Sequence, residues 1–218
     1  MSMLRLEQVS YWYPDRREYV LKNLSYEFEE GRVYSIVGRS GAGKTTLLSL
    51  LAGLASPTEG KIWLGEQDIE RIDKYRYRSH DVGVVFQSFN LLPKLTAAEN
   101  VILSMDIAGK RAGDKEACAM QILADMGLRE DESRRRILKL SGGQQQRVAI
   151  ARAISYEPRI ILADEPTGNL DRETQREIMD IFRRLAHKDH KCVILVTHSA
   201  DVARASDEVY ELGTGVFS

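Results

Sequence analysis

The stretch VYSIVGRSGAGKTTLLSLLAGL, residues 33–54, decides the fold of this chain. It opens with the apolar run 33–37, and residues 38–45 then fit the pattern G-x-x-x-x-G-K-[ST]. Glycines in such a loop leave the backbone free to curl its N–H groups around an anion. A helix expected at residues 45–54 would point its positive end at the bound phosphates. The stretch therefore predicts a strand, a phosphate-binding loop and a helix.

The residue types of this loop indicate its chemistry. Lys44 is expected to contact the β- and γ-phosphates of a nucleotide, and the Thr45 hydroxyl is expected to ligate Mg²⁺. The alternative for the loop is a glycine turn with a structural role only. The residues predicted to bind phosphate are Gly38, Arg39, Ser40, Gly41, Ala42, Gly43, Lys44, Thr45 and Thr46.

Apolar runs recur along the rest of the chain, at residues 82–86, 160–163 and 193–196. Runs this short and this continuous suit strands that are buried on both faces of a parallel sheet. Helical patterns lie between them, notably at residues 144–154 and 173–186. Strands that alternate with helices indicate an α/β fold with a mainly parallel sheet around the phosphate-binding loop.

The N-terminal part has a different pattern. Residues 3–13 and 23–29 mix polar with apolar positions, and residues 61–64 follow the turn signal Pro57-Thr58-Glu59-Gly60. These segments predict a small antiparallel β layer at the edge of the parallel core.

A further segment, residues 89–136, contains no strand-like apolar run and is predicted to be mainly helical. The length of the chain suits one domain, or one core with a sub-domain inserted in it. We therefore expect a single domain over residues 1–218, with an inserted helical sub-domain at about residues 89–155.

The apolar run at residues 160–163 ends in two acids, Asp164 and Glu165. A buried strand that ends in acids is the complement that a phosphate-binding loop requires. We expect Asp164 to hold Mg²⁺ through its water shell, and Glu165 to orient and polarise the attacking water. An acidic strand end alone would usually be a cap or surface charge; together with the loop it indicates nucleotide hydrolysis.

A second glycine-rich motif, Leu140-Ser141-Gly142-Gly143-Gln144-Gln145-Gln146-Arg147, precedes the helical pattern that ends at residue 154. A serine and two glycines at a helix start offer free backbone N–H groups, a hydroxyl donor and a positive helix end. They predict a second anion site, the alternative being an ordinary helix N-cap. These residues resemble the signature sequence of ATP-binding cassette (ABC) proteins, which other phosphate-loop families lack.

The resemblance covers nearly the whole chain, with each motif in the family's order. Gln87 matches the Q-loop, which implies contacts with Mg²⁺ and water and sensing of a transport partner. Gly168-Asn169-Leu170-Asp171 resembles the D-loop, which crosses a dimer interface. His198 matches the switch histidine that contacts the γ-phosphate. The resemblance thus implies that Lys44, Gln87, Glu165 and His198 are catalytic, and that Thr45, Gln87 and Asp164 serve the metal.

The family geometry further implies that two protomers share each ATP. ATP held by the phosphate-binding loop of one protomer would be covered by Ser141, Gly142, Gly143 and Gln144 of another, with Asp171 close by. Tyr13 stands where the family places the aromatic residue that stacks on adenine, and ordinary strand aromatics are the alternative there. The expected pair is a homodimer, or a heterodimer with a related ATPase.

Composition limits the partners and the compartment. With 31 basic and 32 acidic residues, a formal net charge of −1 provides no field that would attract nucleic acid or an anionic membrane. Cys118 and Cys192 form no metal-ligand cluster and are predicted to be buried free thiols. The sequence shows neither a signal peptide nor a run of the roughly 18 apolar residues that a membrane span needs. We therefore expect a cytoplasmic protein, peripheral on the membrane through a permease.

The function implied by the resemblance is ATP hydrolysis that drives a separate permease. Residues 86–101 are similar to the branch that serves lipoprotein release, macrolide export and antimicrobial-peptide resistance, with the cell-division branch close to it. A soluble cassette ATPase that acts on DNA or ribosomes is the alternative, and the lack of sustained heptads disfavours it. A GTPase or small-molecule kinase is disfavoured because the guanine-reading motif Asn-Lys-x-Asp is absent.

Overall fold

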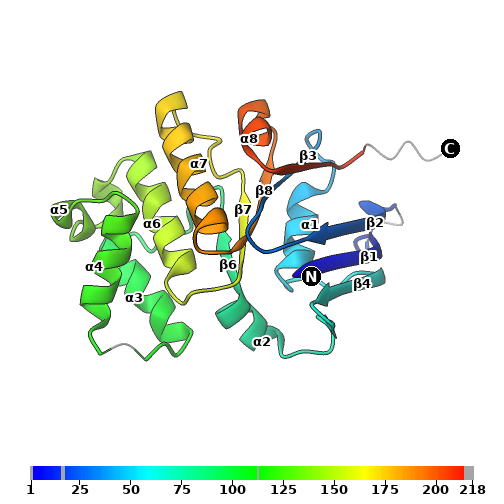
Figure 1. The fold of residues 1–218 in the computed structure, drawn as a ribbon, viewed down its shortest axis with the longest axis horizontal. Helices are drawn as coiled ribbons and strands as arrows, with labels where there is room; N and C mark the ends of the chain where they lie inside the picture. Colours follow the sequence, from blue (N-terminus) through cyan, green and yellow to red (C-terminus); the bar gives the residue numbers. More distant parts are fainter. Residues whose placement is uncertain (1, 16–17, 112, 214–218) are drawn as a thin grey trace.

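The computed structural model describes residues 2–15, 18–111 and 113–213, and it contains a parallel and an antiparallel β-sheet (Figure 1). The parallel sheet, sheet B, has the strand order β6-β7-β8-β3-β9. Its strands are β3 (Val33–Val37), β6 (Val82–Val85), β7 (Ile160–Asp164), β8 (Cys192–Thr197) and β9 (Glu208–Glu211). The predicted α/β class with a parallel sheet is confirmed.

The central strands of sheet B are buried on both faces, because successive side chains of a strand point into two different hydrophobic cores. Ile161 of β7 and Leu195 of β8 belong to the core that the long helices cover. Their neighbours Leu162 and Ile194 belong to the core under the antiparallel sheet. Because both faces of the sheet need apolar residues, these strands appear in the sequence as continuous apolar runs.

The antiparallel sheet, sheet A, has the strand order β2-β1-β4-β5 and lies at one end of the molecule (Figure 1). Its strands are β1 (Leu4–Tyr11), β2 (Leu21–Phe28), β4 (Glu59–Leu64) and β5 (Gln67–Asp68). Helix α1 (Lys44–Leu51) buries Leu47 and Leu50 in the core that also contains Phe28 and Ile62 of sheet A. The predicted antiparallel layer is therefore confirmed, and it packs on the helix that follows the phosphate-binding loop.

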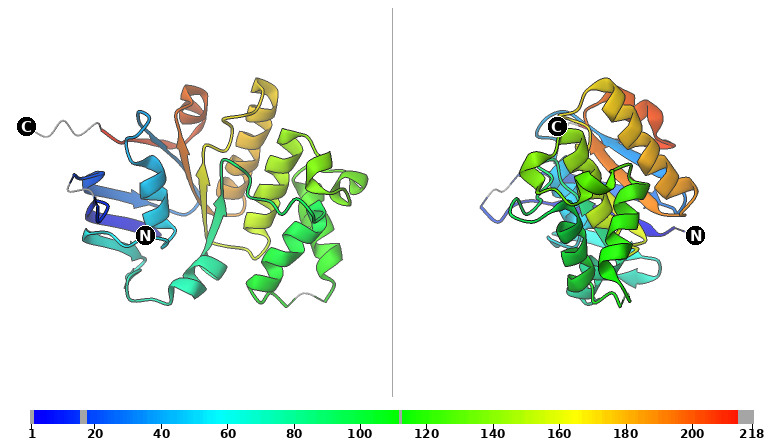
Figure 2. Two further views of the ribbon diagram at one scale, coloured as in Figure 1. Left: turned by 180° about the vertical axis from the view of Figure 1, so that it is seen from behind. Right: turned by 90° about the vertical axis from the view of Figure 1, so that its left-hand side faces the viewer.

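The helices that follow residue 89 gather at the opposite end of the molecule from sheet A (Figures 1 and 2). They are α3 (Ala97–Ile107), α4 (Lys115–Asp125), α5 (Glu130–Ser133) and α6 (Gly142–Ile154), with a 3₁₀ turn at Ile137–Lys139 before α6. Helix α7 (Arg172–His187) buries Ile178, Phe182 and Leu185 against sheet B. Within the described residues, every helix is too short or too polar to cross a membrane.

Several elements differ from the sequence prediction. The helix expected at residues 45–54 ends at Leu51, because Gly53 adopts a left-handed conformation with φ of 64° that terminates it. Strand β9, helices α2 (Lys74–Arg76) and α8 (Ala200–Ala205), and the π-helical turn Tyr77–Asp81 were not predicted. These pieces are short and partly exposed, so no apolar run marks them. Cys118 is half-buried rather than buried.

Strand β6 passes so close to α6 that only glycine fits at Gly83. A Cβ atom at this position would lie 2.4 Å from the carbonyl oxygen of Ala153. We predict that Gly83→Ala lowers the free energy of unfolding by about 1–3 kcal/mol, because backbone must shift to admit the methyl group. Urea denaturation would measure this loss. Gly113→Ala is the control, since no described residue apart from its chain neighbours lies within 4 Å of its added Cβ; equal losses for both variants would contradict the prediction.

Candidate nucleotide-binding site

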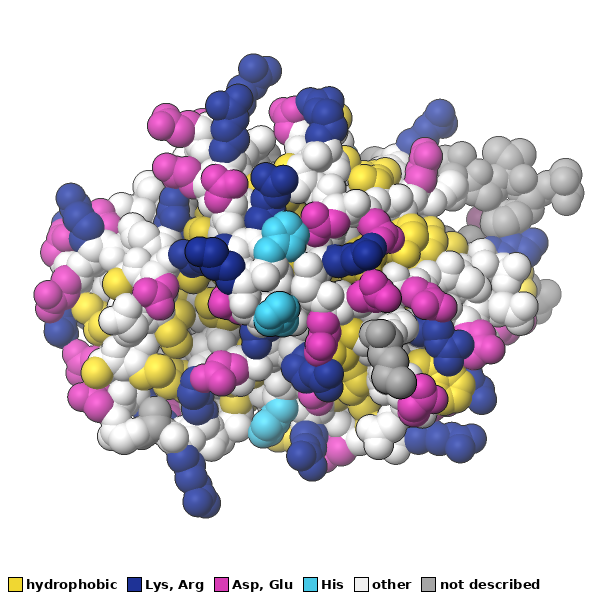
Figure 3. Space-filling view, viewed as in Figure 1, with side chains coloured by type: hydrophobic (Ala, Val, Ile, Leu, Met, Phe, Trp, Pro, Cys, Tyr) yellow, Lys and Arg dark blue, Asp and Glu magenta, His cyan; other side chains and the backbone are white. Residues whose placement is uncertain are grey.

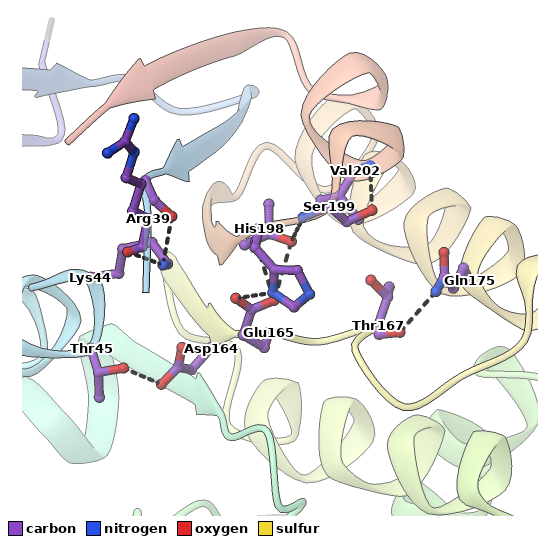
Figure 4. A network of polar contacts seen from close by, with 12 residues as sticks. Arg39, Lys44, Thr45, Asp164, Glu165, Thr167, Gln175, His198, Ser199 and Val202 are labelled. Carbon is purple, nitrogen blue, oxygen red and sulfur yellow. Dashed lines mark hydrogen bonds and ion pairs between the residues drawn. The ribbon is translucent and has the colours of Figure 1, made fainter. Parts of the chain in front are cut away.

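The residues predicted to hold the metal and to act in catalysis meet, beside the phosphate-binding loop, at the edge of sheet B where its parallel strands end (Figure 4). A cavity of about 430 Å³ opens there. It is lined by Tyr13, Val20, Ser40, Gly41, Gly43, Lys44, Thr45, Thr46, Gln87, Asp164, Glu165 and His198. Ligands of open α/β sheets bind at this edge. A larger cleft of about 880 Å³, between sheet A and α2, contains none of the predicted residues.

The glycine-rich loop lines one side of the cavity, and its backbone carbonyls bind the side chain of Lys44. The Lys44 ammonium group donates hydrogen bonds to the carbonyl oxygens of Gly38 at 2.9 Å and Arg39 at 3.1 Å. Gly43 has a φ of 90°, and a Cβ atom there would lie 2.7 Å from the side chain of Leu21. Glycine is therefore required at this position by both conformation and space.

Thr45 and Asp164 face each other across the cavity (Figure 4). The Thr45 hydroxyl donates a hydrogen bond of 3.1 Å to the Asp164 carboxylate. Burial raises the pKa of Asp164, and the neighbouring Glu165 carboxylate raises it further, although the bond from Thr45 and the charge of Lys44 act in the opposite direction. A cation bound here would favour the ionised form of Asp164. Gln87 lines the same cavity and adds an amide oxygen.

Glu165 is held by the end of the neighbouring strand β8 (Figure 4). Its carboxylate accepts hydrogen bonds from the Thr197 hydroxyl at 3.3 Å, the His198 backbone N–H at 3.4 Å and His198 Nδ1 at 2.7 Å. Glu165 also has a φ of 45°, a left-handed conformation that only a small fraction of non-glycine residues adopt. The carboxylate thus has a fixed direction before any ligand is bound.

The aromatic residues near the N-terminus divide between the cavity and the surface of sheet A. Tyr13 lines the cavity, and its hydroxyl lies 3.0 Å from the hydroxyl of Thr46. Tyr11 packs edge-on against Tyr13, while Trp12 packs against Tyr19, and neither lines the cavity. The geometry therefore favours Tyr13 for contact with a base.

The second predicted anion site lies outside this cavity. Ser141 and Gln144 form a reciprocal cap at the start of α6, in which each side chain accepts a hydrogen bond from the backbone N–H of the other. Asp171 caps α7 and accepts from the backbone and hydroxyl of Thr174, contacts that lower the pKa of Asp171. Ser141, Gly142 and Asp171 are exposed. One copy of the chain does not bring these residues to the loop at residues 38–45.

Sequence reasoning missed two residues that hold the site together. Thr197 is buried and donates to Glu165; its position directly before His198 was the available signal. Arg152 of α6 donates to the carbonyl oxygens of Phe89 and Asn90, just after Gln87. No local pattern marks Arg152, because the contact joins segments far apart in the sequence.

Comparison with known proteins places this geometry in context. A family model described as ABC transporter matches residues 21–168. An uncharacterised ABC transporter ATP-binding protein, YclH of Bacillus subtilis, is 44% identical over 218 residues, which is 100% of this chain and 96% of that protein. The lipoprotein-releasing system ATP-binding protein LolD of Legionella pneumophila is 40% identical, over 90% of this chain and 87% of its own length.

A solved structure agrees with these sequence relatives. It is a dimeric, post-hydrolysis state of the ATP-binding cassette MJ0796 of Methanocaldococcus jannaschii, bound to ADP and Pi. The two chains are 39% identical and superpose with a TM-score of 0.89, over 98% of this chain and 95% of the other. The similarity therefore extends over both sheets and all the helices that surround the cavity.

Substitution of the loop lysine tests the cavity as a nucleotide site. We predict that Lys44→Ala weakens ATP binding by at least about 100-fold, because two charge-assisted hydrogen bonds to phosphate are lost. Isothermal titration calorimetry would measure the change. Lys139→Ala, an exposed lysine outside the cavity, is the matched control and should bind ATP normally. Normal binding by Lys44→Ala would refute the assignment.

Proposed function

This chain belongs to the ABC transporter ATPase family, and from that premise we propose how its residues bind ATP, hydrolyse it and drive a membrane permease. Its class of activity, ATP hydrolysis by the ATP-binding subunit of an ABC transporter, follows from family membership. One observation carries the residue-level proposal: Lys44, Thr45, Asp164 and Glu165 line a single cavity at the carboxyl edge of sheet B.

ATP would lie with its phosphates in the loop formed by residues 38–46. Lys44 would exchange the carbonyl oxygens of Gly38 and Arg39 for the β- and γ-phosphates, and helix α1 would direct its positive end at them. Tyr13, 41% exposed at the cavity rim, would stack on the adenine.

The oxygen atoms beside the loop fit Mg²⁺. The Thr45 hydroxyl, the Asp164 carboxylate and the Gln87 amide oxygen line one cavity and are hard ligands. No group of three or more His, Cys, Asp or Glu side chains in the described residues could hold a metal ion alone, which agrees with an ion that takes its other ligands from phosphate and water. When bound, Mg²⁺ neutralises charge on the phosphate oxygens.

Glu165 would orient and polarise the attacking water, and His198 would contact the γ-phosphate. In this structure, the two side chains contact each other, with 2.7 Å between Nδ1 and the carboxylate. We propose that the γ-phosphate draws His198 away and leaves a carboxylate oxygen of Glu165 free for water. Thr197 keeps the carboxylate in place through its own hydrogen bond during this exchange.

The separation of the two anion sites supports a two-copy arrangement. The helix start at Ser141 is exposed, and the N–H groups of Gly142 and Gly143 lack partners within the helix. We propose that these groups cover ATP bound by a second copy, with Gln144 and Asp171 beside it. MJ0796, the similar cassette described above, is dimeric in its ADP- and Pi-bound structure.

An exposed apolar patch supports attachment to a permease on the cytoplasmic face of the membrane. Tyr75 of α2 and Ile107 of α3 are 62% and 56% exposed, and the Tyr75 hydroxyl donates to the Ile107 carbonyl at 3.3 Å. Large apolar side chains exposed together mark interaction sites. We call Tyr75 and Ile107 the apolar patch.

We also propose that residues 1–218 act as one domain with a helical sub-domain at residues 89–155. Two arginines tie this helical part to α7: Arg147 pairs with Glu177 at 2.6 Å, and Arg184 donates to the carbonyl oxygen of Asp125 at 2.7 Å.

The alternative of a soluble ATPase that acts on nucleic acid is not favoured. Helices α3 and α4 span 11 residues each, too short for a coiled-coil arm. Opposite charges are interspersed on the face in Figure 3, which does not favour nucleic acid.

Dimer formation is tested with the hydrolysis step blocked. We predict that Glu165→Gln binds ATP and shifts from monomer to dimer in its presence at low salt, because removal of the carboxylate stops the reaction but leaves the phosphate contacts. Solution mass with and without ATP would show the change. A monomer in both conditions, with ATP shown to bind, would contradict self-pairing.

The metal requirement is tested by chelation. In the wild-type chain, EDTA should stop ATP hydrolysis and excess Mg²⁺ should restore it.

Membrane attachment is tested at the apolar patch. We predict that Tyr75→Glu lowers the fraction of the chain recovered with membranes severalfold when the genomic neighbours are expressed, because a charge replaces an apolar contact. ATP affinity should not change, since Tyr75 lies outside the cavity. Leu138→Glu, at an apolar residue that is 78% exposed elsewhere, is the control. Equal membrane recovery for Tyr75→Glu and the wild type would count against the patch.

A further inference from the structure

A buried carboxylate lies behind the second anion site. Glu132 of α5 is only 8% exposed, which is unusual for an acid unless it is paired. It accepts a hydrogen bond from the backbone N–H of Arg129 at 2.9 Å, and it forms an ion pair with the Arg129 guanidinium at 2.8 Å. Its third partner comes from another helix, because the side-chain amide of Gln144 donates a hydrogen bond to Glu132 at 2.9 Å.

This third bond fixes the orientation of Gln144. A carboxylate accepts hydrogen bonds only, so the nitrogen of the Gln144 amide must face Glu132. The amide oxygen then faces the other way, toward the backbone N–H of Ser141 at 2.9 Å. Without an acceptor at residue 132, the amide could turn its NH₂ group toward Ser141, and the two donors would repel each other.

The orientation of Gln144 in turn sets the state of the Ser141 hydroxyl. Ser141 Oγ accepts a hydrogen bond from the backbone N–H of Gln144 at 3.3 Å, which completes the reciprocal cap. No described residue accepts the hydroxyl proton of Ser141 in return. The hydroxyl is therefore held by its oxygen while its proton remains free to donate to an anion.

We propose that Glu132 is a positioning residue for the second anion site. Through its hydrogen bond with Gln144, Glu132 orients Ser141 toward the ATP bound by the other copy. This inference rests on the proposed two-copy function and adds to it a residue outside the signature. Glu132 acts on the contact that closes the dimer, not on the loop that first binds ATP. Loss of Glu132 should therefore weaken dimerisation and leave binding of ATP to the monomer intact.

The test compares dimerisation in the Glu165→Gln background. Glu132→Ala should raise the ATP concentration at half-maximal dimerisation by about tenfold, since a helix cap is loosened at both sites of the dimer. Glu132→Gln keeps an acceptor oxygen and should shift that concentration by no more than about threefold. Glu130→Ala is the control, because Glu130 lies on the same helix, is exposed and pairs with Arg134. Fluorescent-nucleotide titration measures ATP binding to each monomer.

A double substitution separates positioning from general damage. If Glu132 acts through Gln144, Glu132→Ala combined with Gln144→Ala should shift dimerisation no more than Gln144→Ala alone. Additive shifts would overturn the proposal. The proposal would also be overturned if Glu132→Ala and Glu130→Ala reached half-maximal dimerisation at the same ATP concentration. It would likewise be overturned if Glu132→Ala lost ATP binding by the monomer, or thermal stability, in parallel with dimerisation. If the Glu165→Gln parent itself fails to dimerise with ATP, the proposed two-copy function is contradicted. This result differs from those above, in which the parent dimerises and only the role of Glu132 is contradicted.

Discussion

Parallel pairing of β3, β7 and β8 is the constraint on which the site depends. In the register of these strands, Val37 lies beside Thr197, and Asp164 lies beside Val196. The chain leaves all three strands at the same edge, so the glycine-rich loop, the acid pair and His198 emerge together, although the loop is more than a hundred residues from the other two in the sequence. A change of register by one residue would turn these side chains into the core.

The same edge keeps its polar groups satisfied without ligand. The ammonium of Lys44 donates hydrogen bonds to loop carbonyls, and the carboxylate of Glu165 accepts hydrogen bonds from Thr197 and His198. These bonds avoid the cost of buried charges without partners, and each can be exchanged for a bond to phosphate or water. Asp164 is the least satisfied of these groups, since burial raises its pKa and, among the described residues, one neutral hydroxyl donates to it.

The sequence could predict those parts of the molecule that local pattern determines. Continuous apolar runs marked the central strands, and glycine spacing marked the loop, because each needs particular residue types within a short window. Tyr13 was predicted from its place in the family's pattern, with ordinary strand aromatics as the alternative; the structure adds that Tyr13 lines the cavity while Tyr11 and Trp12 do not. Glu132 could not be predicted: its role depends on a contact between two helices, and the sequence around it is a run of charged residues.

The edge strand β9 has a consequence for how copies can associate. It occupies one end of sheet B, with Glu208 and Glu211 at its ends and Tyr210 stacked on Tyr26 of sheet A. A strand from another molecule that tried to extend the sheet would meet carboxylates at both ends of a very short edge, which natural proteins use to block such pairing. This edge of sheet B therefore resists pairing with a strand of another copy, so two copies must meet through other surfaces.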